Sequence, residues 1–365
     1  MMKYRKIIIS LLTTLILLSS FSVTVAISVK TEISLFNNNK KSDDLIHPTI
    51  DFYVDDDGGA DYTKIQDAIN QSSDGFTIFV YNGTYYENIT INKSITLIGE
   101  NKNSTIIDGS YKDYCTVVVV LADFVNLSSF TIQNSGFSFE GIENGILITS
   151  NFNNIENCII RNCWDGIYLH DFLGSTIKNN KIKGNIFTNI REVDISCNRA
   201  DNNIISENFL TKGIILLGNS NNNTIYRNGF SGGSISQFGL SKANNNTISY
   251  NSFSKSSEVC FSVKESNNNI IHHNNFKNIK IWGIRLEDSH HNSIHHNNFI
   301  KCLIKASFVQ STFNKWRQNY WGRPRLLPKV ISGRVGRFLG IIPWLNIDWR
   351  PALKPNKIDI LKKVI

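Results

Sequence analysis

The segment Asn246-Thr-Ile-Ser-Tyr-Asn-Ser-Phe253 returns 23 residues later as Asn269-Ile-Ile-His-His-Asn-Asn-Phe276, and 23 residues later again as Asn292-Ser-Ile-His-His-Asn-Asn-Phe299. A sequence period of this length is typical of solenoid proteins, in which each repeat stacks on the next one. The repeat can be followed further through one central apolar residue per copy, at Ile177, Ile205, Ile225, Ile248, Ile271, Ile294 and Trp316. It therefore decides the fold of at least the second half of the chain.

Each repeat also contains an apolar pair that indicates a strand. Phe261 and Val263, for example, precede Ile271 and lie two residues apart, which is the side-chain period of a β-strand. A unit of this length with short strands and no helical period has no room for a helix. Each strand must then lie parallel on its copy in the next turn, about 4.8 Å away. The sequence predicts an all-β fold, a right-handed single-stranded parallel β-helix of about ten turns.

Asparagine is unusually frequent, with 47 of the 365 residues. One phase of the repeat is occupied by Asn180, Asn208, Asn228, Asn251, Asn274, Asn297 and Asn319. Because a side-chain amide can bond to its copy above and below, and because Asn tolerates a tight turn, we expect a stacked Asn ladder there. Proline is absent from residues 49 to 323, as a continuous ladder of backbone N–H groups requires.

Both ends of a β-helix expose strand edges and need a cover. At the front, Ile65, Ala68 and Ile69 share one helical face, which predicts a short capping helix. At the back, residues 317 to 365 carry eleven Lys and Arg against two Asp and Glu. This basic segment is expected to be a cap, or else an adhesive for acidic wall polymer or lipid headgroups. The predicted domains are a signal peptide or anchor at 1–29, a linker at 30–51, the β-helix at 52–322 and a C-terminal cap at 323–365.

The charge of the chain argues against nucleic acid as a partner. The formal net charge of +8 is concentrated in the C-terminal segment, and the rest of the chain is close to neutral. No motif for reading bases accompanies this charge. We therefore expect no nucleic-acid binding.

The N-terminus has the composition of an export signal. Lys3, Arg5 and Lys6 precede an uncharged stretch from 7 to 29, in which Thr24-Val-Ala26 offers small residues to a signal peptidase. The stretch is also long enough to stay as an uncleaved membrane anchor. In either case the rest of the chain is expected to be secreted or held at the cell surface.

The six cysteines form no recognisable metal or disulfide framework, because no CxxC spacing occurs. Most of them are expected to be small buried core residues. Cys158 and Cys163 are the pair to test first for a disulfide.

Three motifs near the front resemble a known superfamily. Asp57-Gly-Gly-Ala-Asp-Tyr-Thr-Lys-Ile-Gln-Asp-Ala-Ile69, Gly83-Thr-Tyr-Tyr-Glu-Asn88 and Ile95-Thr-Leu-Ile-Gly-Glu100 resemble the opening of pectin-lyase-like β-helix proteins, pectin methylesterases included. The Asn-rich turns from 151 to 321 resemble the NosD-like repeat of secreted archaeal and bacterial proteins. The resemblance implies the fold. It does not choose a function, because the superfamily contains lyases, hydrolases, esterases, epimerases, copper-associated periplasmic proteins and inert surface proteins.

The catalytic motifs of these families are missing. Gly83, Tyr85 and Glu87 match the GxYxE start of the methylesterase pattern, which is largely structural. The QDTL and DFIFG segments of the esterases do not occur, nor do the GHG and RIK of the polygalacturonases or a DPHE-like segment of the alginate epimerases. No known active site therefore transfers to this chain.

A cluster of aromatic, acidic and basic residues is the first candidate site. The candidate ligand-binding residues are Trp164, Tyr168, Asp171 and Arg191, and the candidate catalytic residues are Asp165, His170 and Glu192. Rings and carboxylates in a groove are what polysaccharide binding and acid–base chemistry need. The segment from Lys183 to Glu192 is expected to project beside them as a loop. The alternative is a ladder of charges on adjacent turns, in which Asp171 faces Arg199 and Lys242 faces Glu265 and Asp288.

Two pairs of histidines occupy the same phase in consecutive turns and are the second candidate site. They are His272 with His273 and His295 with His296. Stacked turns bring such rings within reach of a shared copper or zinc ion. The alternative is a solvated polar face, since the other copies of this phase are polar. Copper and calcium are the two cofactors that the sequence leaves open.

The sequence thus supports three functions. The first is an exported surface β-helix without catalysis that engages polysaccharide or another envelope polymer. The second is a carbohydrate-active enzyme, a lyase or hydrolase. The third is a copper-associated protein of the NosD kind. Product formation separates the second from the first, and bound metal separates the third.

Overall fold

A computed structural model of the chain describes residues 49–111, 115–136, 143–233, 236–336 and 342–358. The predicted signal or anchor and nearly all of the predicted linker lie outside these residues. From Ile50 onward the chain forms one compact unit. Within the described ranges, no helix is both long enough and apolar enough to cross a membrane.

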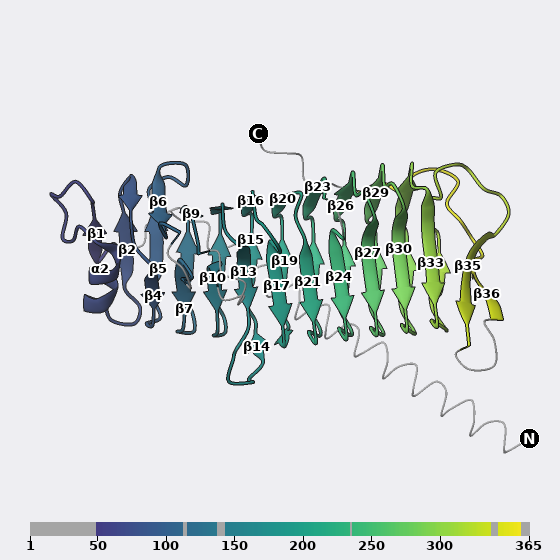
Figure 1. The fold of residues 1–365 in the computed structure, drawn as a ribbon, viewed down its shortest axis with the longest axis horizontal. Helices are drawn as coiled ribbons and strands as arrows, with labels where there is room; N and C mark the ends of the chain where they lie inside the picture. Colours follow the sequence, from purple (N-terminus) through teal and green to yellow (C-terminus); the bar gives the residue numbers. More distant parts are fainter. Residues whose placement is uncertain (1–48, 112–114, 137–142, 234–235, 337–341, 359–365) are drawn as a thin grey trace, which may run out of the picture. The chain divides into compact units, whose positions relative to one another are not determined.

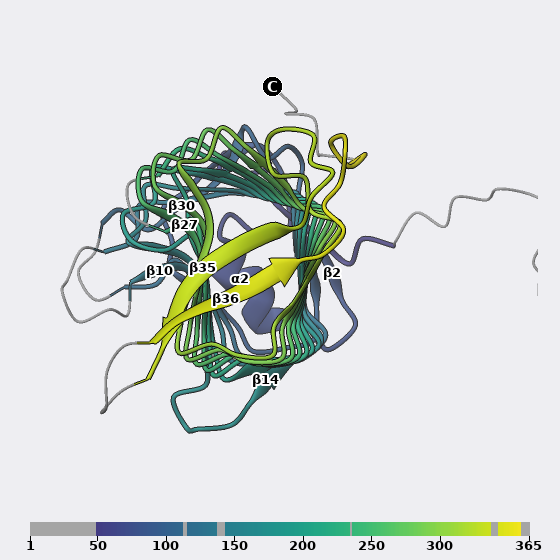
Figure 2. The ribbon, with the colours of Figure 1, turned by 90° about the vertical axis from the view of Figure 1, so that its right-hand side faces the viewer.

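Short parallel strands stack along one axis and make three faces (Figures 1 and 2). After the N-terminal turn, which contains a helix, the chain passes through the first, the second and the third face in that order. The first face holds β1 (Phe52–Val54), β2 (Thr77–Val80), β5 (Thr96–Gly99), β8 (Asn126–Ser128), β11 (Asn154–Glu156), β15 (Lys181–Lys183), β19 (Ile204–Ser206), β22 (Thr224–Tyr226), β25 (Thr247–Ser249), β28 (Ile270–His272), β31 (Ser293–His295), β34 (Lys315–Arg317) and β36 (Ile342–Asp348).

The other two faces are built in the same way. The second face holds β3 (Gly83–Tyr85), β6 (Thr105–Asp108), β9 (Thr131–Gln133), β12 (Ile159–Arg161), β16 (Ile186–Thr188), β20 (Phe209–Thr211), β23 (Gly229–Ser231), β26 (Ser252–Ser254), β29 (Asn275–Lys277) and β32 (Asn298–Ile300). The third face holds β4 (Ile89–Ile91), β7 (Val118–Val120), β10 (Asn144–Ile148), β13 (Asp165–Leu169), β17 (Ile195–Asn198), β21 (Ile215–Gly218), β24 (Phe238–Ser241), β27 (Val259–Lys264), β30 (Trp282–Glu287), β33 (Ile304–Val309) and β35 (Lys329–Val335). The parallel β-helix is therefore confirmed, with about 12 turns.

The core consists of side chains that repeat from turn to turn. On the first face Ile248, Ile271 and Ile294 pair in register and are fully buried. On the second face Phe253, Phe276 and Phe299 stack with ring centroids 5.0 Å apart. Apolar burial of such residues is the main stabilising term, and stacking aromatic copies adds to it.

The predicted register is wrong at the first copy of the repeat. Ile177 forms the short strand β14 (Ile177–Lys178) and pairs with Ala200 of β18 (Ala200–Asp201), whereas Ile182 pairs with Ile205. In the later copies of the repeat, one asparagine lies two residues before the central isoleucine and another lies three residues after it. Ile182 has this pattern, with Asn180 before it and Asn185 after it. The extra residues of this long turn therefore precede Ile182 and project near β14 in Figure 1. The segment predicted to project, Lys183 to Glu192, instead contains ordinary strands.

The asparagines form two ladders, one on each side of the first face. In both, the backbone N–H donates to the Oδ1 of the next turn, and in most turns the side-chain amide does so too, as in Asn251 to Asn274 at 3.0 and 3.1 Å. One ladder contains Asn185, Asn208, Asn228, Asn251, Asn274, Asn297 and Asn319. The other contains Asn153, Asn180, Asn203, Asn223, Asn246, Asn269, Asn292 and Asn314. The predicted ladder is confirmed except at Asn180, which belongs to the second one.

Both ends are covered. The predicted capping helix is α2 (Ile65–Gln71), and Glu87 accepts hydrogen bonds from the backbone N–H groups of Ile65 and Gln66 at 2.9 and 3.0 Å. At the other end β35 and β36 form an antiparallel hairpin across the last turn (Figure 2). Trp321 is buried beneath it, and Ile331 of β35 is itself buried.

The cysteines are free thiols, and five of the six are buried. Cys158 and Cys163, the pair singled out for a disulfide, form no bond with each other. Burial raises the pKa of Cys158 to about 12 and that of Cys163 to about 11, so both thiols are inert core residues at neutral pH.

Candidate functional site

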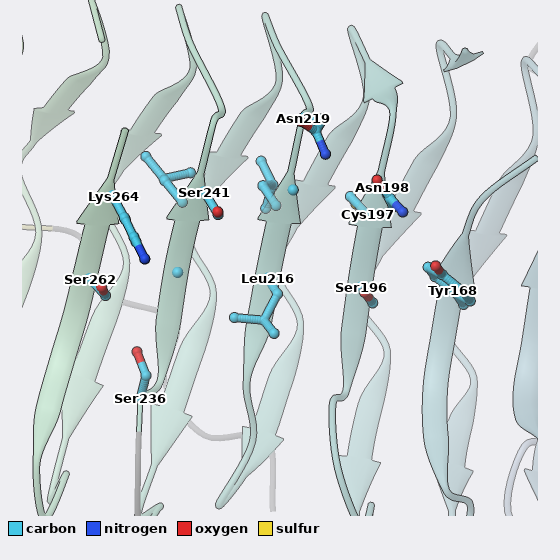
Figure 3. A pocket seen from close by; sticks show the side chains of 14 residues that line it. Tyr168, Ser196, Cys197, Asn198, Leu216, Asn219, Ser236, Ser241, Ser262 and Lys264 are labelled. Carbon is cyan, nitrogen blue, oxygen red and sulfur yellow. The ribbon is translucent and has the colours of Figure 1, made fainter. Parts of the chain in front are cut away.

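A shallow groove of about 520 Å³ runs over the outer side of the third face (Figure 3). One row of its lining crosses β13, β17, β21, β24 and β27 in register: Tyr168, Ser196, Leu216, Gly239 and Ser262. The groove exists because most of this row is small. A side chain at Gly239 would start only 2.7 Å from the Leu216 side chain, so the glycine keeps the floor open.

A second row of the lining is polar and neutral except at one end. Asn198, Gly218, Ser241 and Lys264 follow one another in register along the third face. Lys264 is the only charged side chain in the described lining, and no carboxylate is present there. The groove therefore offers hydroxyl and amide groups along its length, with one ammonium group at an end.

Aromatic side chains close the end of the groove opposite Lys264. The rings of Tyr168 and His170 stack with centroids 5.2 Å apart, and Phe172 meets the His170 ring edge-on at 4.6 Å. His170 Nδ1 lies 3.4 Å from the carbonyl oxygen of Asn198. Tyr168 and His170, which the sequence singled out, therefore do adjoin a groove.

The predicted cluster is divided by strand β13. Asp165 begins this strand and His170 follows its last residue, so the two lie about 17 Å apart along the extended backbone. They cannot act on the same bond. The structure thus places the candidate residues in two groups at opposite edges of the third face.

The group at the start of β13 contains four of the predicted residues. The Arg191 guanidinium lies over the Trp164 ring, 4.3 Å from its centroid, and the backbone N–H of Glu192 donates to the Trp164 carbonyl at 2.9 Å. Asp165 accepts a hydrogen bond from the Val193 backbone at 3.0 Å. Burial, with a smaller contribution from the Glu192 carboxylate, raises the pKa of Asp165 to about 6.

Asp171 has a structural role. Its two carboxylate oxygens accept hydrogen bonds from the backbone N–H groups of Leu173 and Ser175, at 2.9 and 3.0 Å. These bonds lower its pKa and close the projecting turn. Of the charge pairs considered as the alternative, Lys242 and Glu265 do meet, with Nζ and Oε2 3.9 Å apart.

Asp194 was not identified from the sequence. It is 2% exposed, and its Oδ2 accepts a hydrogen bond from the Ile214 backbone at 2.6 Å. Burial raises its pKa to about 7. Gly213 makes the room, since a Cβ there would lie 2.4 Å from the carboxylate. An aspartate at an inward position opposite a glycine is the signal that could have found it.

The four histidines at His272, His273, His295 and His296 gather at the turn between the first and second faces, and we call them the His tetrad. Within each turn the two Nδ1 atoms lie close together, 2.8 Å apart in one pair and 2.9 Å in the other. Between turns the rings stack, His272 on His295 at 5.2 Å and His273 on His296 at 4.8 Å. The predicted proximity is therefore present.

Three carboxylates also lie close together near the N-terminal end, at Asp55, Asp56 and Asp57. Asp56 accepts a hydrogen bond from the Thr84 backbone at 3.0 Å, and Asp55 accepts one from Asp57 at 3.2 Å. These bonds account for the positions of two of the three side chains within the loop.

Two family models match parts of the chain. Residues 51–199 match the pectinesterase family, and residues 198–326 match the family described as periplasmic copper-binding protein (NosD). The predicted resemblance is confirmed. The second match contains the His tetrad and most of the groove. The first contains the Trp164 group.

Curated and solved proteins give partial matches. A cell surface glycoprotein of Methanothermus fervidus is 31% identical over 152 residues, and this chain spans about a quarter (25%) of its length. The A-module of a mannuronan C-5 epimerase from Azotobacter vinelandii has a TM-score of 0.48 at 12% identity, over 70% of this chain and 86% of that one. A lacto-N-biosidase from Eubacterium ramulus has a TM-score of 0.49 at 10% identity, over 83% and 68%. The family and glycoprotein matches support an extracellular β-helix protein.

Proposed function

We propose that the chain is a cell-surface β-helix protein that binds a polysaccharide along the groove of its third face. The observation that carries the proposal is the row from Tyr168 to Ser262, in which five consecutive turns present an aromatic ring and then mostly small residues. The turns rise about 4.8 Å. This spacing is close to the length of one sugar ring in an extended glycan, so successive rings can meet equivalent positions.

The chemistry of the groove favours binding over cleavage. Glycan hydrolysis needs an acid and a base on either side of the bond, usually two carboxylates. In the described lining, the titratable side chains are Lys264, Tyr168 and the buried thiol of Cys197. The rows of hydroxyl and amide groups suit a neutral glycan. We expect no acidic polymer to be preferred, because a single ammonium group gives little charge attraction.

The test is binding by the purified chain to a panel of neutral and acidic polysaccharides, read by affinity electrophoresis and by mass spectrometry of the products. Ser262→Tyr fills the groove from an outward strand position and is expected to weaken binding at least tenfold. Thr247→Tyr adds the same ring on the first face and serves as the matched control. Equal binding by both variants would place the glycan elsewhere, and shortened or unsaturated products would overturn the non-catalytic role.

A second candidate function is a carbohydrate-active enzyme that uses the group at the start of β13. The observation in its favour is Asp165, whose pKa of about 6 beside Glu192 is suited to proton transfer. If products form in the panel, Asp165→Asn is expected to abolish them, whereas Ser262→Tyr is not. The third role, copper association, has its own residues in the His tetrad, which lies outside the groove.

A further inference from the structure

We propose that the His tetrad is a two-site metal centre, in which each Nδ1 pair chelates one Cu(II) ion. The pairs are His272 with His273 and His295 with His296. Copper binding there is a function separate from glycan binding, because the tetrad lies between the first and second faces and the groove lies on the third.

The separation of the two nitrogens in each pair selects the coordination geometry. Imidazole nitrogens bind such ions at about 2.0–2.1 Å, so two of them at a right angle are about 2.9 Å apart, and two at a tetrahedral angle about 3.4 Å apart. The observed separations are 2.8 and 2.9 Å. Each pair therefore fits two neighbouring corners of the square arrangement that Cu(II) and Ni(II) prefer, and fits tetrahedral zinc less well.

The backbone holds each pair in this arrangement. Successive side chains of a strand point to opposite sides, so two adjacent histidines in a strand would diverge. Here the second one has a left-handed backbone, with φ of 53° at His273 and 56° at His296, which turns its ring toward the first. The Asn ladder fixes the turn, because the Asn274 amide donates to the His272 carbonyl at 3.1 Å. The site is thus preorganised by the solenoid.

The surroundings make the two pairs unequal. Arg317 pairs with His295 in register on the next strand of the first face, so its positive charge opposes a cation at the second pair. On the other side the Tyr250 ring stacks on His273 at 5.1 Å. We expect the pair His272 and His273 to fill first and the second pair to bind more weakly.

One ion cannot use all four rings in this geometry. Nitrogens on opposite corners of a square are about 4.1 Å apart, and neighbouring ones about 2.9 Å. Rings of consecutive turns are separated by 5.2 and 4.8 Å between centroids. The spacing therefore predicts two ions about 5 Å apart, close enough for their unpaired electrons to interact.

The test is titration of the purified full chain with Cu(II), followed by calorimetry and electron paramagnetic resonance. Wild type is expected to bind two ions with a dipole-broadened signal. The double variants H272F/H273F and H295F/H296F keep the ring stack and should each bind one ion with a sharp signal. His291→Phe, whose ring stacks on Phe313 at 5.2 Å, is the matched control and should bind two.

Three results would overturn the proposal. They are the absence of copper binding by wild type, an unchanged stoichiometry in both double variants, and complete loss of binding in either one, which would mean a single four-ring site. Thermal unfolding of each variant shows whether the fold is kept. Ser262→Tyr is expected to retain both ions, so failure of the metal proposal and failure of the glycan proposal give different results.

Discussion

Asp348 accepts hydrogen bonds from the backbone N–H and the side-chain amide of Asn319, at 3.0 and 3.2 Å, in the place that the asparagine of a further turn would take. The ladder has a direction, because every asparagine donates to the Oδ1 of the next turn. Its last member therefore needs an acceptor only, and a carboxylate has two acceptor oxygens and no donor. Asp348 also accepts from the Trp321 indole N–H at 3.0 Å and from the Gln318 backbone at 3.1 Å.

This relationship predicts that Asp348→Asn destabilises the protein although it removes no volume. An amide has only one acceptor oxygen, so its NH₂ group must face N–H donors. Those donors, and the NH₂ group itself, then have no acceptor. We expect a loss of about 3 kcal/mol, the cost of one or two buried unsatisfied groups. Chemical denaturation measures it, with Asp57→Asn at an exposed site as the control. A loss below about 0.5 kcal/mol would show that the end of the ladder is not coupled to stability.

A substitution inside the ladder should destabilise the protein at least as much as Asp348→Asn does at its end. Asn251→Ala removes the acceptor of the Asn228 amide and backbone N–H, at 3.0 and 2.9 Å, and also the donor to the Ile225 carbonyl at 3.0 Å. We expect a loss of about 3–5 kcal/mol in the free energy of unfolding. Asn245→Gly is the control, because Asn245 is exposed and has a φ of 58°, which glycine adopts freely. Equal midpoints for the two variants would contradict the role of the ladder.

The solenoid could be predicted because its cause is periodic. Ile248, Ile271 and Ile294 repeat with both the strand period and the turn period, so the sequence contains the stacking directly. The register at Ile177 was missed because Ile177 also has an asparagine three residues after it, Asn180, and the second asparagine, two residues before the isoleucine, was not required. Two flanking asparagines at the proper distances identify Ile182 instead.

The candidate site was harder to predict than the fold. Nearness in sequence suggested that Asp165 and His170 act together, but a strand separates them by its full length. The groove lies where side chains are small or missing, as at Gly239. Small residues do not stand out in a sequence as candidates for a binding site. The His tetrad was found because its rings share one phase of the repeat.

The buried carboxyl of Asp194 predicts that stability falls as pH rises. Its pKa is about 7 in the folded chain and 3.8 as the ordinary value, so the folded state holds the proton more tightly. The contribution of the protonated Asp194 to the free energy of unfolding is on the order of 4 kcal/mol. This contribution is fully present below pH 4 and is lost as the pH rises to about 7. Asp194→Asn keeps an acceptor and stays neutral, so its stability relative to wild type should increase over this range.

The measurement is denaturant unfolding of wild type and Asp194→Asn at pH 4, 5.5 and 8. The difference between the two proteins isolates Asp194 from the His tetrad, whose lowered pKa values act in the opposite sense between pH 6.5 and 4. Asp74→Asn, at an exposed site, should show no such change. A difference that is constant with pH would mean that Asp194 is ionised throughout.

The C-terminal segment is predicted to act first as a cap and only then as an adhesive. Truncation after residue 322 removes Asp348 and the hairpin β35–β36, and with them the cover over the buried Trp321. We expect a marked loss of stability, measured as a lower thermal midpoint, because the core and the ladder are then open to water. Unchanged unfolding of the truncated chain would instead leave adhesion as the main role of this segment.

Adhesion has its own residues within the same segment. Leu326 and Leu327 are 90% and 77% exposed, next to the cations Arg323 and Arg325. Apolar and cationic side chains together favour binding to an anionic lipid surface. The leucines can insert into the membrane, and the arginines can contact the lipid headgroups. Leu326→Ser with Leu327→Ser should leave the thermal midpoint unchanged and reduce sedimentation with vesicles that contain phosphatidylglycerol, while vesicles of phosphatidylcholine alone bind neither protein. Retention by the double variant equal to wild type would show that charge alone, and hence equally an acidic polymer, accounts for the attachment.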